Sequence, residues 1–267
     1  MQSSLRFDFH VHSMLSKSIP FSLSDLDLMI SQAKKRHLDG FALTEHIHAP
    51  GYWDTYRQVK GSFVYRRGVY RVNRDFHILN GAEINLGSGG HLIVIGEMDA
   101  IQDLDERLDL TEGNRPTLAE VLEIADTSLI FHGAHPFRPE GGIIKSPDYL
   151  LKQLCALELN GKDADMEKIV RTAASELGMS LIGGSDAHLW PQVGISITTL
   201  PKETVSISSL KKMVTSELTK AALHPDSSRI ADMCSRHKRA MKERMLGKKP
   251  TVPVKLYKNK GIQLSFV

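Results

Sequence analysis

Histidine and carboxylate side chains recur along this sequence at the points where short apolar segments end. The chain contains 12 His and 31 Asp and Glu residues, and the two kinds stand close together in several places. The sets are Asp8-Phe9-His10-Val11-His12, Thr44-Glu45-His46, Gly81-Ala82-Glu83, His91, His135-Pro136 and Gly184-Ser185-Asp186-Ala187-His188. Neutral imidazole and carboxylate together bind borderline divalent metals. The pattern therefore predicts a polynuclear metal centre, and such centres typically hydrolyse substrates with a metal-activated water.

Short apolar runs alternate with helical patterns along most of the chain. The expected strands cover 5–12, 40–44, 78–83, 91–96, 129–131, 156–160, 180–183 and 194–199, and the expected helices begin at or near Ser24, Thr117, Pro147, Asp165 and Ser208. Repeated alternation of this kind predicts a parallel sheet covered by helices. The metal-type residues lie at strand ends, as catalytic groups do on one face of closed α/β barrels. We therefore expect a TIM-like α/β barrel of about seven β/α units.

The segment Trp53–Arg74 interrupts this alternation. It is rich in Tyr and Arg, and we expect a loop or helical insertion over the site. Tyr52, Tyr56, Tyr65 and Tyr70 could stack on a nucleobase. A packed lid is the alternative, and we favour it.

The length of 267 residues and the hydrophobic content of 41% fit one large domain with an appendage. We expect a barrel domain over residues 1–225 and a basic extension over 226–267. The whole chain has a net charge of only +3, but the extension holds eleven basic residues against three acidic ones. Apolar residues recur there at near-helical spacing (Ile230, Met233, Met241, Met245, Leu246) and then alternate as in a strand (Val252, Val254, Leu256). We expect a tail that packs on the barrel, with a nucleic-acid-binding arm as the alternative.

The two cysteines, Cys155 and Cys234, are far apart and show no C-x-x-C spacing. This usage is typical of a reduced cytoplasmic protein. The first metal-type motif begins at Asp8, which leaves no room for a signal peptide before it. No apolar run approaches the length needed to span a bilayer, so we expect no membrane segment.

His10 and His12 lie two residues apart, so in a strand both rings point to one side. A shared metal ion is one reading, and two ordinary buried histidines are the other. Asp8 could orient one of the imidazoles. Two further positions have competing histidines nearby: His48 for His46, and His132 for His135.

Taken in order, these motifs resemble those of the PHP (polymerase and histidinol phosphatase) family of metal-dependent phosphoesterases. The resemblance covers roughly residues 7–225. The matching segments are Asp8-x-His10-x-His12, Thr44-Glu45-His46 in place of a T-D-H motif, Gly81-x-Glu83, Gly90-His91, Ala134-His135-Pro136 and Gly184-Ser185-Asp186-x-His188. The family fold is a distorted (β/α)7 barrel, which agrees with the alternation of strands and helices.

The resemblance also implies a set of ligands for two or three divalent ions, with Mn, Zn or Fe as the expected metals. It implies His10, His12, Glu83 and Asp186 for the first ion, Glu83, His91 and His135 for the second, and His46 and His188 for the third. The chain departs from the family after Ser16, where Lys17 and Ser18 stand in place of a further ligand. A charged lysine has no lone pair to donate. The third site is therefore expected to be weak, differently ligated or absent.

The implied activity is hydrolysis of a phosphomonoester or phosphodiester in a small phosphorylated metabolite or nucleotide. Arg138 and Lys17 are expected to hold the phosphate, since a guanidinium fork matches its oxygens. Asp186 and His188 are expected to act as catalytic groups that protonate the leaving alkoxide. Two alternatives stay open, an amidohydrolase-type C–N hydrolase and a PHP-like scaffold that binds nucleic acid. The oligomeric state is not predicted.

Overall fold

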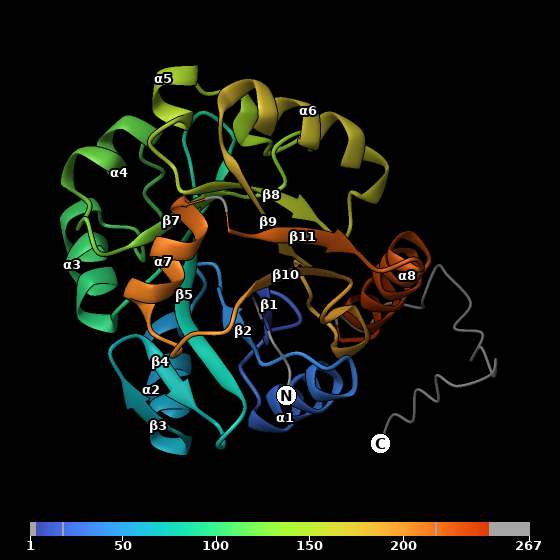
Figure 1. Ribbon diagram of the computed structural model, residues 1–267. Helices are drawn as coiled ribbons and strands as arrows, with labels where there is room; N and C mark the ends of the chain where they lie inside the picture. The colour runs from blue at the N-terminus through green and yellow to red at the C-terminus, as the bar shows by residue number, and fades with distance from the viewer. Residues whose placement is uncertain (1–3, 18, 217, 246–267) are drawn as a thin grey trace.

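The computed structural model describes residues 4–17, 19–216 and 218–245 (Figure 1). Its strands lie in the middle of the molecule, and helices surround them. Seven strands follow one another around the barrel: β1 (Ser4–Val11), β2 (Gly40–Leu43), β5 (His77–Asn85), β6 (His91–Ile95), β7 (Ile130–Gly133), β8 (Ala156–Asn160) and β9 (Ser180–Gly184). The expected barrel of about seven strands is confirmed.

The barrel closes between the segment after β9 and β1. Val11 and Ala187 form a parallel bridge, the His12 amide donates to Ala187 O at 2.8 Å, and the Asp186 amide donates to His10 O at 2.8 Å. Two further strands, β10 (Ser196–Pro201) and β11 (Lys220–Leu223), continue the sheet beyond β1. The closure therefore brings the first and last metal-type motifs side by side.

The expectation of a parallel sheet is wrong for part of the barrel. β6 is antiparallel to both β5 and β7, and β10 is antiparallel to β1 and to β11. The reason for β6 is the short turn between Asn85 and His91, because a parallel connection needs a crossover of a dozen or more residues. As a result, His91, the first residue of β6, lies opposite Asn85, the last residue of β5. The two residues therefore lie at the same end of the barrel.

The helices are α1 (Leu23–Lys35), α2 (Tyr52–Ser62), α3 (Met98–Leu108), α4 (Leu118–Ile124), α5 (Asp148–Leu151), α6 (Glu167–Leu177), α7 (Ile207–Thr215) and α8 (Ser227–Met245), with short 3-10 turns η1 (Ile143–Lys145), η2 (Ala164–Met166) and η3 (Trp190–Gln192). Thr117 and Glu120 form the expected capping box of α4. Gly178 ends α6 in the left-handed region, at φ 65°. The expected cap of α1 at Ser24 is wrong, since the Ser22 side chain accepts from the Asp25 amide. Helix α3 and strand β11 were not expected.

The insertion at Trp53–Arg74 forms part of the fold. It contains most of α2 and a hairpin of β3 (Val64–Arg66) and β4 (Val69–Arg71), and β4 pairs with β5. Tyr52, Tyr56 and Tyr70 are buried, with 2%, 0% and 0% of their surface exposed. The packed reading is therefore confirmed, and stacking of these three rings on a base is wrong.

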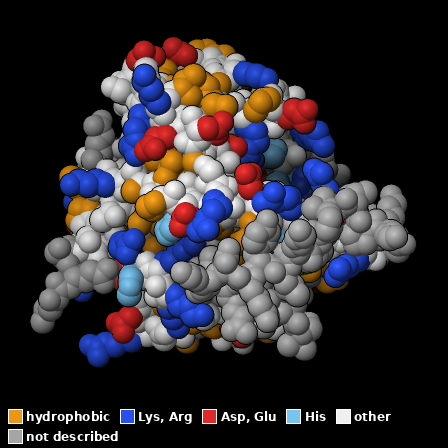
Figure 2. Space-filling model, turned by 90° about the vertical axis from the view of Figure 1, so that its right-hand side faces the viewer, with side chains coloured by type: hydrophobic (Ala, Val, Ile, Leu, Met, Phe, Trp, Pro, Cys, Tyr) orange, Lys and Arg blue, Asp and Glu red, His pale blue; other side chains and the backbone are white. Residues whose placement is uncertain are grey.

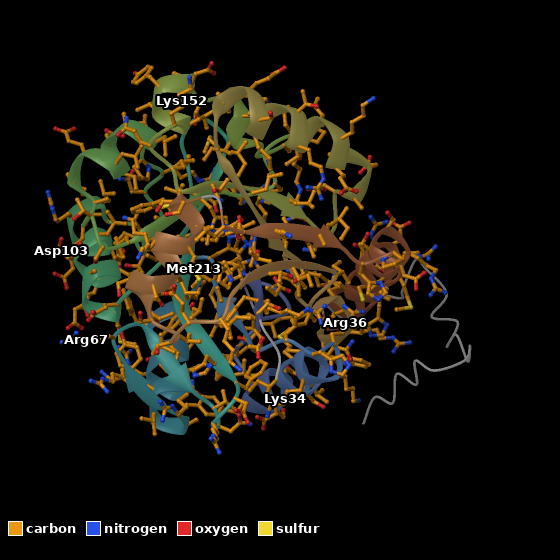
Figure 3. All side chains as sticks on the ribbon, in the orientation of Figure 1. Lys34, Arg36, Arg67, Asp103, Lys152 and Met213 are labelled. Carbon is orange, nitrogen blue, oxygen red and sulfur yellow. The ribbon has the colours of Figure 1, made fainter. Side chains whose placement is uncertain are left out.

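Two groups of apolar side chains hold the barrel. The first, the inner cluster, joins side chains of the strands to one face of α7; its buried members are Leu5, Phe7, Phe9, Ala42, Val69, Leu79, Ile93, Ile95, Ile130, Ala134, Ala156, Ile182 and Leu200 with Ile207, Leu210, Met213 and Val214. The second packs the outer faces of the strands against the surrounding helices. Figure 3 labels Met213 on α7, over the strands, and Asp103 and Lys152 at the periphery. Helix α7 therefore fills one end of the barrel and leaves the other end to polar side chains.

The described part of the basic extension is mainly helix α8, as expected. Ile230, Ala231 and Cys234 are buried in a small apolar group with Ile195. Of the other apolar residues expected on this helix, Met233 and Met241 are partly buried. The side chain of Met245, Leu246 and the expected strand at 252–256 lie outside the described residues. No helix within the described ranges is long and apolar enough to cross a membrane.

Candidate metal centre

The carboxylate of Glu83 on β5 lies at the centre of the polar end of the barrel. It is 1% exposed. Glu83 Oε1 is 2.6 Å from His91 Nδ1 and 3.4 Å from His135 Nε2. Glu83 Oε2 is 3.0 Å from His46 Nδ1 and 3.1 Å from His12 Nε2. His10 Nε2 also lies 3.6 Å from Oε2, so the two oxygens face different sets of imidazoles, as would suit a carboxylate shared by two ions.

Seven residues surround this point and form the His/Glu cluster: His10, His12, His46, Glu83, His91, His135 and His188. They divide into three overlapping groups whose candidate ligand atoms lie within 4.8 Å of one another: His10 with His12 and Glu83, Glu83 with His91 and His135, and His12 with His46 and His188. The structure thus brings together seven of the eight expected ligands. Glu83 belongs to two groups, and so does His12, whose place in the third group was not expected.

β1 supplies the first group through a local irregularity. Its pairing with β2 shifts register between Asp8 and Val11. Phe9 lies in the inner cluster while His10, the next residue, lies beside Glu83. A β-bulge of this kind lets two consecutive side chains point inward. His12 then follows on the same side, with its Nε2 3.0 Å from His10 Nε2.

Glu158 on β8 orients two of the histidines, a role that the sequence motifs did not reveal. Its carboxylate is fully buried, and Oε1 lies 2.9 Å from His10 Nδ1. Oε2 accepts the His135 amide at 2.8 Å. Although burial opposes ionisation, the charge of His10 lowers the pKa of Glu158 to about 2. The sequence signal for this residue was a carboxylate within the otherwise apolar segment Ala156–Leu159.

His135 has a strained backbone, with φ of 29°, and Asp186 has φ of 52°. Non-glycine residues rarely adopt these values and do so mainly where surrounding bonds hold them in place. The amide of His135 is held by Glu158, and the amide of Asp186 by His10 O. Both strained residues therefore sit in the polar end of the barrel, as functional residues often do.

Asp8 does not orient an imidazole. Its Oδ1 accepts the amides of Ser185 and His10 at 2.8 and 3.2 Å, and its Oδ2 accepts the Gly194 amide at 2.8 Å. The expected contact with a histidine ring is therefore wrong. Asp8 instead ties β1 to the segments after β9, which keeps the first and last motifs in register.

The competing histidines have other surroundings. His48 Nε2 is 2.6 Å from Lys17 Nζ. His132 is fully buried, its two ring nitrogens have no hydrogen-bond partner among the described residues, and burial lowers its pKa to about 3. Neither ring belongs to the His/Glu cluster, so the geometry favours His46 and His135 as ligand candidates. Ser18 lies outside the described residues.

Asp186 lies at the edge of the first group and is held by two cations. Its Oδ1 is 3.5 Å from His12 Nε2 and 2.9 Å from Lys162 Nζ, and its Oδ2 is 3.0 Å from Arg138 Nη1. Although burial opposes ionisation, Lys162 and Arg138 keep the pKa of Asp186 well below its usual range. Asp186 is thus a carboxylate, suited to bind or orient and not to donate a proton.

Arg138 uses its guanidinium within the protein. Besides Asp186, it donates to Asp163 Oδ2 from Nη2 at 2.8 Å and from Nε at 3.0 Å. Two carboxylates therefore accept hydrogen bonds from the Arg138 guanidinium in this structure. Lys162, which the motifs did not single out, lies between Asp186 and His188, with Nζ 3.3 Å from His188 Nδ1.

The cluster has the features expected of a metal site. In its neutral form His10 would direct its Nδ1 proton to Glu158 and present an Nε2 lone pair towards His12. Glu83 Oε2 is buried and has no hydrogen-bond partner among the described residues, although several imidazoles surround it. Buried acceptors that face one another without protons are unfavourable. Divalent cations between them would satisfy these atoms, so the residues present fit the implied metals.

A cavity of about 350 Å³ opens beside the third group. Its lining residues are Ser16, Lys17, His46, Pro50, His188, Lys238 and Lys242. Burial lowers the pKa of Lys238 to about 7, and the charge of Lys162 acts in the same direction. Figure 2 faces the side of the molecule that carries α8 and shows Lys and Arg side chains gathered there, some of them next to His. The basic extension thus contributes directly to the surroundings of the metal-type residues.

Residues 168–215, from α6 to α7, match the PHP-associated family PHP_C. No curated protein matches the sequence. Among solved structures, PsfC from Pseudomonas syringae is 24% identical, with a TM-score of 0.71 over 90% of this chain and 100% of PsfC. The lesion-specific endonuclease Q from Pyrococcus furiosus is 19% identical, with a TM-score of 0.65 over 82% of this chain.

A two-domain protein from Bacteroides vulgatus, which contains a predicted PHP-like metal-dependent phosphoesterase, is 18% identical, with a TM-score of 0.57 over 86% of this chain and 69% of its own. The alignment covers 57% of the endonuclease Q chain, so this protein matches just over half of it. At these identities the likeness establishes the fold. Together with the PHP-associated segment, it confirms the resemblance to the PHP family that the motifs indicate.

Proposed function

We propose that this protein is a metal-dependent phosphoesterase that hydrolyses a small phosphorylated metabolite or nucleotide. The observation that carries the proposal is the position of Glu83, whose two oxygens face different sets of histidines at the polar end of the barrel. The match to a PHP-associated segment and the shared fold support the same class of reaction. The free cysteines, Cys155 and Cys234, fit the further proposal of a cytoplasmic location.

The His/Glu cluster would hold two or three divalent ions, with Mn, Zn or Fe as candidates. Bound ions would polarise the phosphoryl group and lower the pKa of a water molecule. Glu158 lies 2.9 Å from the ring of His10, and Glu45 Oε2 lies 3.5 Å from His12 Nδ1, so both carboxylates support the histidines of the first group. His188 lines the cavity, and Lys162 lies 3.3 Å from its Nδ1.

Cleavage of a nucleic-acid phosphodiester is the second candidate. Lysines of α8 line the cavity, and cationic side chains favour phosphate backbones in general. One structure with the same fold, with a TM-score of 0.61 and 20% identity, is endonuclease Q in complex with a duplex substrate carrying an abasic lesion. For this chain the buried tyrosines of the insertion remove one expected base-stacking surface. We therefore favour a small substrate.

The proposal is tested by assaying the Mn²⁺-loaded protein on three substrate classes: small phosphomonoesters, short oligonucleotides and amides. We expect phosphate release from phosphomonoesters that stops on chelation. His188→Ala and Asp186→Asn should each lower turnover by at least about a hundredfold, the size expected when an acid–base or metal-linked group is removed. Hydrolysis of amides alone would support the amidohydrolase alternative and contradict the proposal. Wild-type turnover in both variants would remove these residues from the mechanism.

A further inference from the structure

The cavity beside the His/Glu cluster is lined by two kinds of functional side chain. His46 and His188 belong to the third histidine group. Three lysines also line the cavity, Lys17 from the segment after β1 and Lys238 and Lys242 from α8. A molecule in this cavity would therefore touch the candidate metal ligands and the lysines at once.

Helix α8 delivers its lysines to the cavity through its own periodicity. Ile230, Ala231 and Cys234 form its buried stripe and pack against Ile195. Lys238 and Lys242 follow Cys234 at successive intervals of four residues, so they continue the same face of the helix. The apolar stripe fixes α8 on the barrel, and the lysines extend that face over the site.

Arg36, at the end of α1, lies on the side of the molecule where α8 lies (Figure 3). Arg36 Nη1 donates to Val193 O at 2.6 Å.

In the described part of the chain these three lysines form no direct ion pair with a carboxylate, although Lys17 Nζ lies 2.6 Å from His48 Nε2. Among residues 4–17, 19–216 and 218–245, no Asp or Glu lies within 4.0 Å of the ammonium of Lys17, Lys238 or Lys242. Lys162 adds a fourth ammonium near Lys238, although it is paired with Asp186. Like charges gathered at a cavity repel one another. An anion in the cavity would relieve this repulsion.

We propose that Lys238 and Lys242 bind a second anionic group of the substrate, while its scissile phosphate lies at the His/Glu cluster. The substrate class is then a small phosphomonoester that carries another phosphate or a carboxylate on the same molecule. This inference rests on the proposed phosphoesterase function and adds specificity to it. It also gives the basic extension a role in substrate selection in addition to its packing on the barrel.

The size of the cavity favours a small molecule over a nucleic-acid strand. A volume of about 350 Å³ lies at the lower end of the usual range for small-ligand sites, which is about 300–1,000 Å³. The lysines line the same cavity as the candidate ligands His46 and His188, so a second anionic group of a short molecule would reach them. A nucleic-acid substrate is an outcome that the experiment can detect.

The kinetic test compares three substrates with the same four-carbon chain: butanediol monophosphate, butanediol bisphosphate and phosphooxybutanoate. The full-length Mn²⁺-loaded enzyme should prefer at least one of the doubly anionic substrates by about tenfold or more in kcat/KM, as expected for a hydrogen bond between charged groups. The variant Lys238→Gln/Lys242→Gln should lose that preference. The matched control Arg236→Gln/Arg239→Gln removes the same charge from exposed positions of α8 and should keep it.

The bisphosphate and the carboxylate arms show which anion the lysines bind, and a preference for either supports the proposal. Equal kcat/KM for all three substrates, or a preference that survives in Lys238→Gln/Lys242→Gln, would overturn it. Selective loss of activity on a single-stranded oligonucleotide in that variant would also overturn it, in favour of a nucleic-acid substrate. If no phosphomonoester is hydrolysed at all, the proposed function fails and the binding test below still decides the inference.

The binding test uses the wild-type protein and does not depend on turnover. Lysines are acetylated with acetic anhydride, with and without butanediol bisphosphate, and the labelled positions are measured by mass spectrometry. Protection of Lys238 and Lys242, with unchanged labelling of exposed Lys34 on α1, is the expected result. Equal labelling of Lys238 and Lys242 with and without the bisphosphate would overturn the proposal even if the enzyme is active.

Discussion

The two ends of the barrel interior are lined by the same strands but have opposite chemistry. On β1, Phe9 belongs to the inner cluster and His10 to the His/Glu cluster; on β8, Ala156 faces the inner cluster and Glu158 holds His10. At the end covered by α7, burial of apolar surface stabilises the fold. At the other end, several buried nitrogens and oxygens have no hydrogen-bond partner among the described residues, which destabilises the fold unless a ligand is present. The difference teaches that one end supplies stability and the other supplies chemistry.

The largest effect is expected at Glu83, the residue shared by two groups of candidate ligands. Glu83→Gln removes a bridging charge, and loss of an interaction worth about 4 kcal/mol in the transition state corresponds to about a thousandfold in rate. Phosphatase turnover and bound metal should both fall, while the far-UV circular dichroism spectrum stays the same. Glu97→Gln, at an exposed carboxylate, is the control. Turnover within tenfold of wild type would show that the polar end does not depend on this residue.

The opposite behaviour is expected at the end filled by α7. Leu210 is fully buried in the inner cluster, and Leu210→Ala should lower the free energy of unfolding by about 2–5 kcal/mol. The turnover of the folded fraction should not change, because Leu210 is remote from the cavity residues. Denaturant titration measures the first quantity and assays at low temperature measure the second. Leu28→Ala, at a side chain that is 49% exposed, should do much less. A fall in turnover without a fall in stability would contradict the division between the two ends.

Glu158 tests whether the histidines need their supporting carboxylate. Glu158→Gln keeps the shape of the side chain but weakens its hold on the His10 ring. Loss of such a partner typically lowers metal affinity by about 10–100-fold. Competition with a chelator would measure the change, and Asp148→Asn on the surface provides the comparison. An unchanged affinity would mean that the ring orientation is fixed by packing alone.

A smaller effect is expected at Arg138, whose guanidinium forms ion pairs with both Asp163 and Asp186. Arg138→Lys should lower kcat by about tenfold, since a hydrogen bond between charged groups contributes roughly 1.5–3 kcal/mol and lysine can replace part of it. If Arg138 positions Asp186, KM should change little. If it binds the phosphate directly, as its sequence context predicts, KM should rise instead. Kinetics equal to those of wild type would assign Arg138 to structure only.

The sequence predicted the class of fold and the residues that gather at the polar end. His10 and His12 could be placed on one side of a strand, and Glu83 and His135 at strand ends, because these are local properties of the chain. The motif order then indicated a resemblance to the PHP family, which the match of residues 168–215 to a PHP-associated family supports, and the solved structures share the fold. The bulge in β1 that turns both Phe9 and His10 inward has no local signal of this kind.

Several contributions could not be predicted because they depend on segments far apart in the chain. Glu158 meets His10 across 148 positions, and Asp8 meets Gly194 across 186. The antiparallel pairing of β6 follows from the short turn before it, which the alternation of strands and helices alone does not reveal. The lysines of α8 looked like surface charges in a basic tail. Their role becomes visible only when the apolar stripe at Ile230 and Cys234 docks the helix beside the cavity.

The metal content of the protein tests the central claim most directly. Protein purified without chelator should contain two or more equivalents of transition metal per chain by elemental analysis, and Glu83→Gln should contain clearly less. The same treatment of Leu210→Ala should leave the metal content of the folded protein unchanged, because that variant alters only the apolar end. Less than half an equivalent in the wild type, after growth in metal-supplemented medium, would contradict the assignment of the polar end as a metal centre.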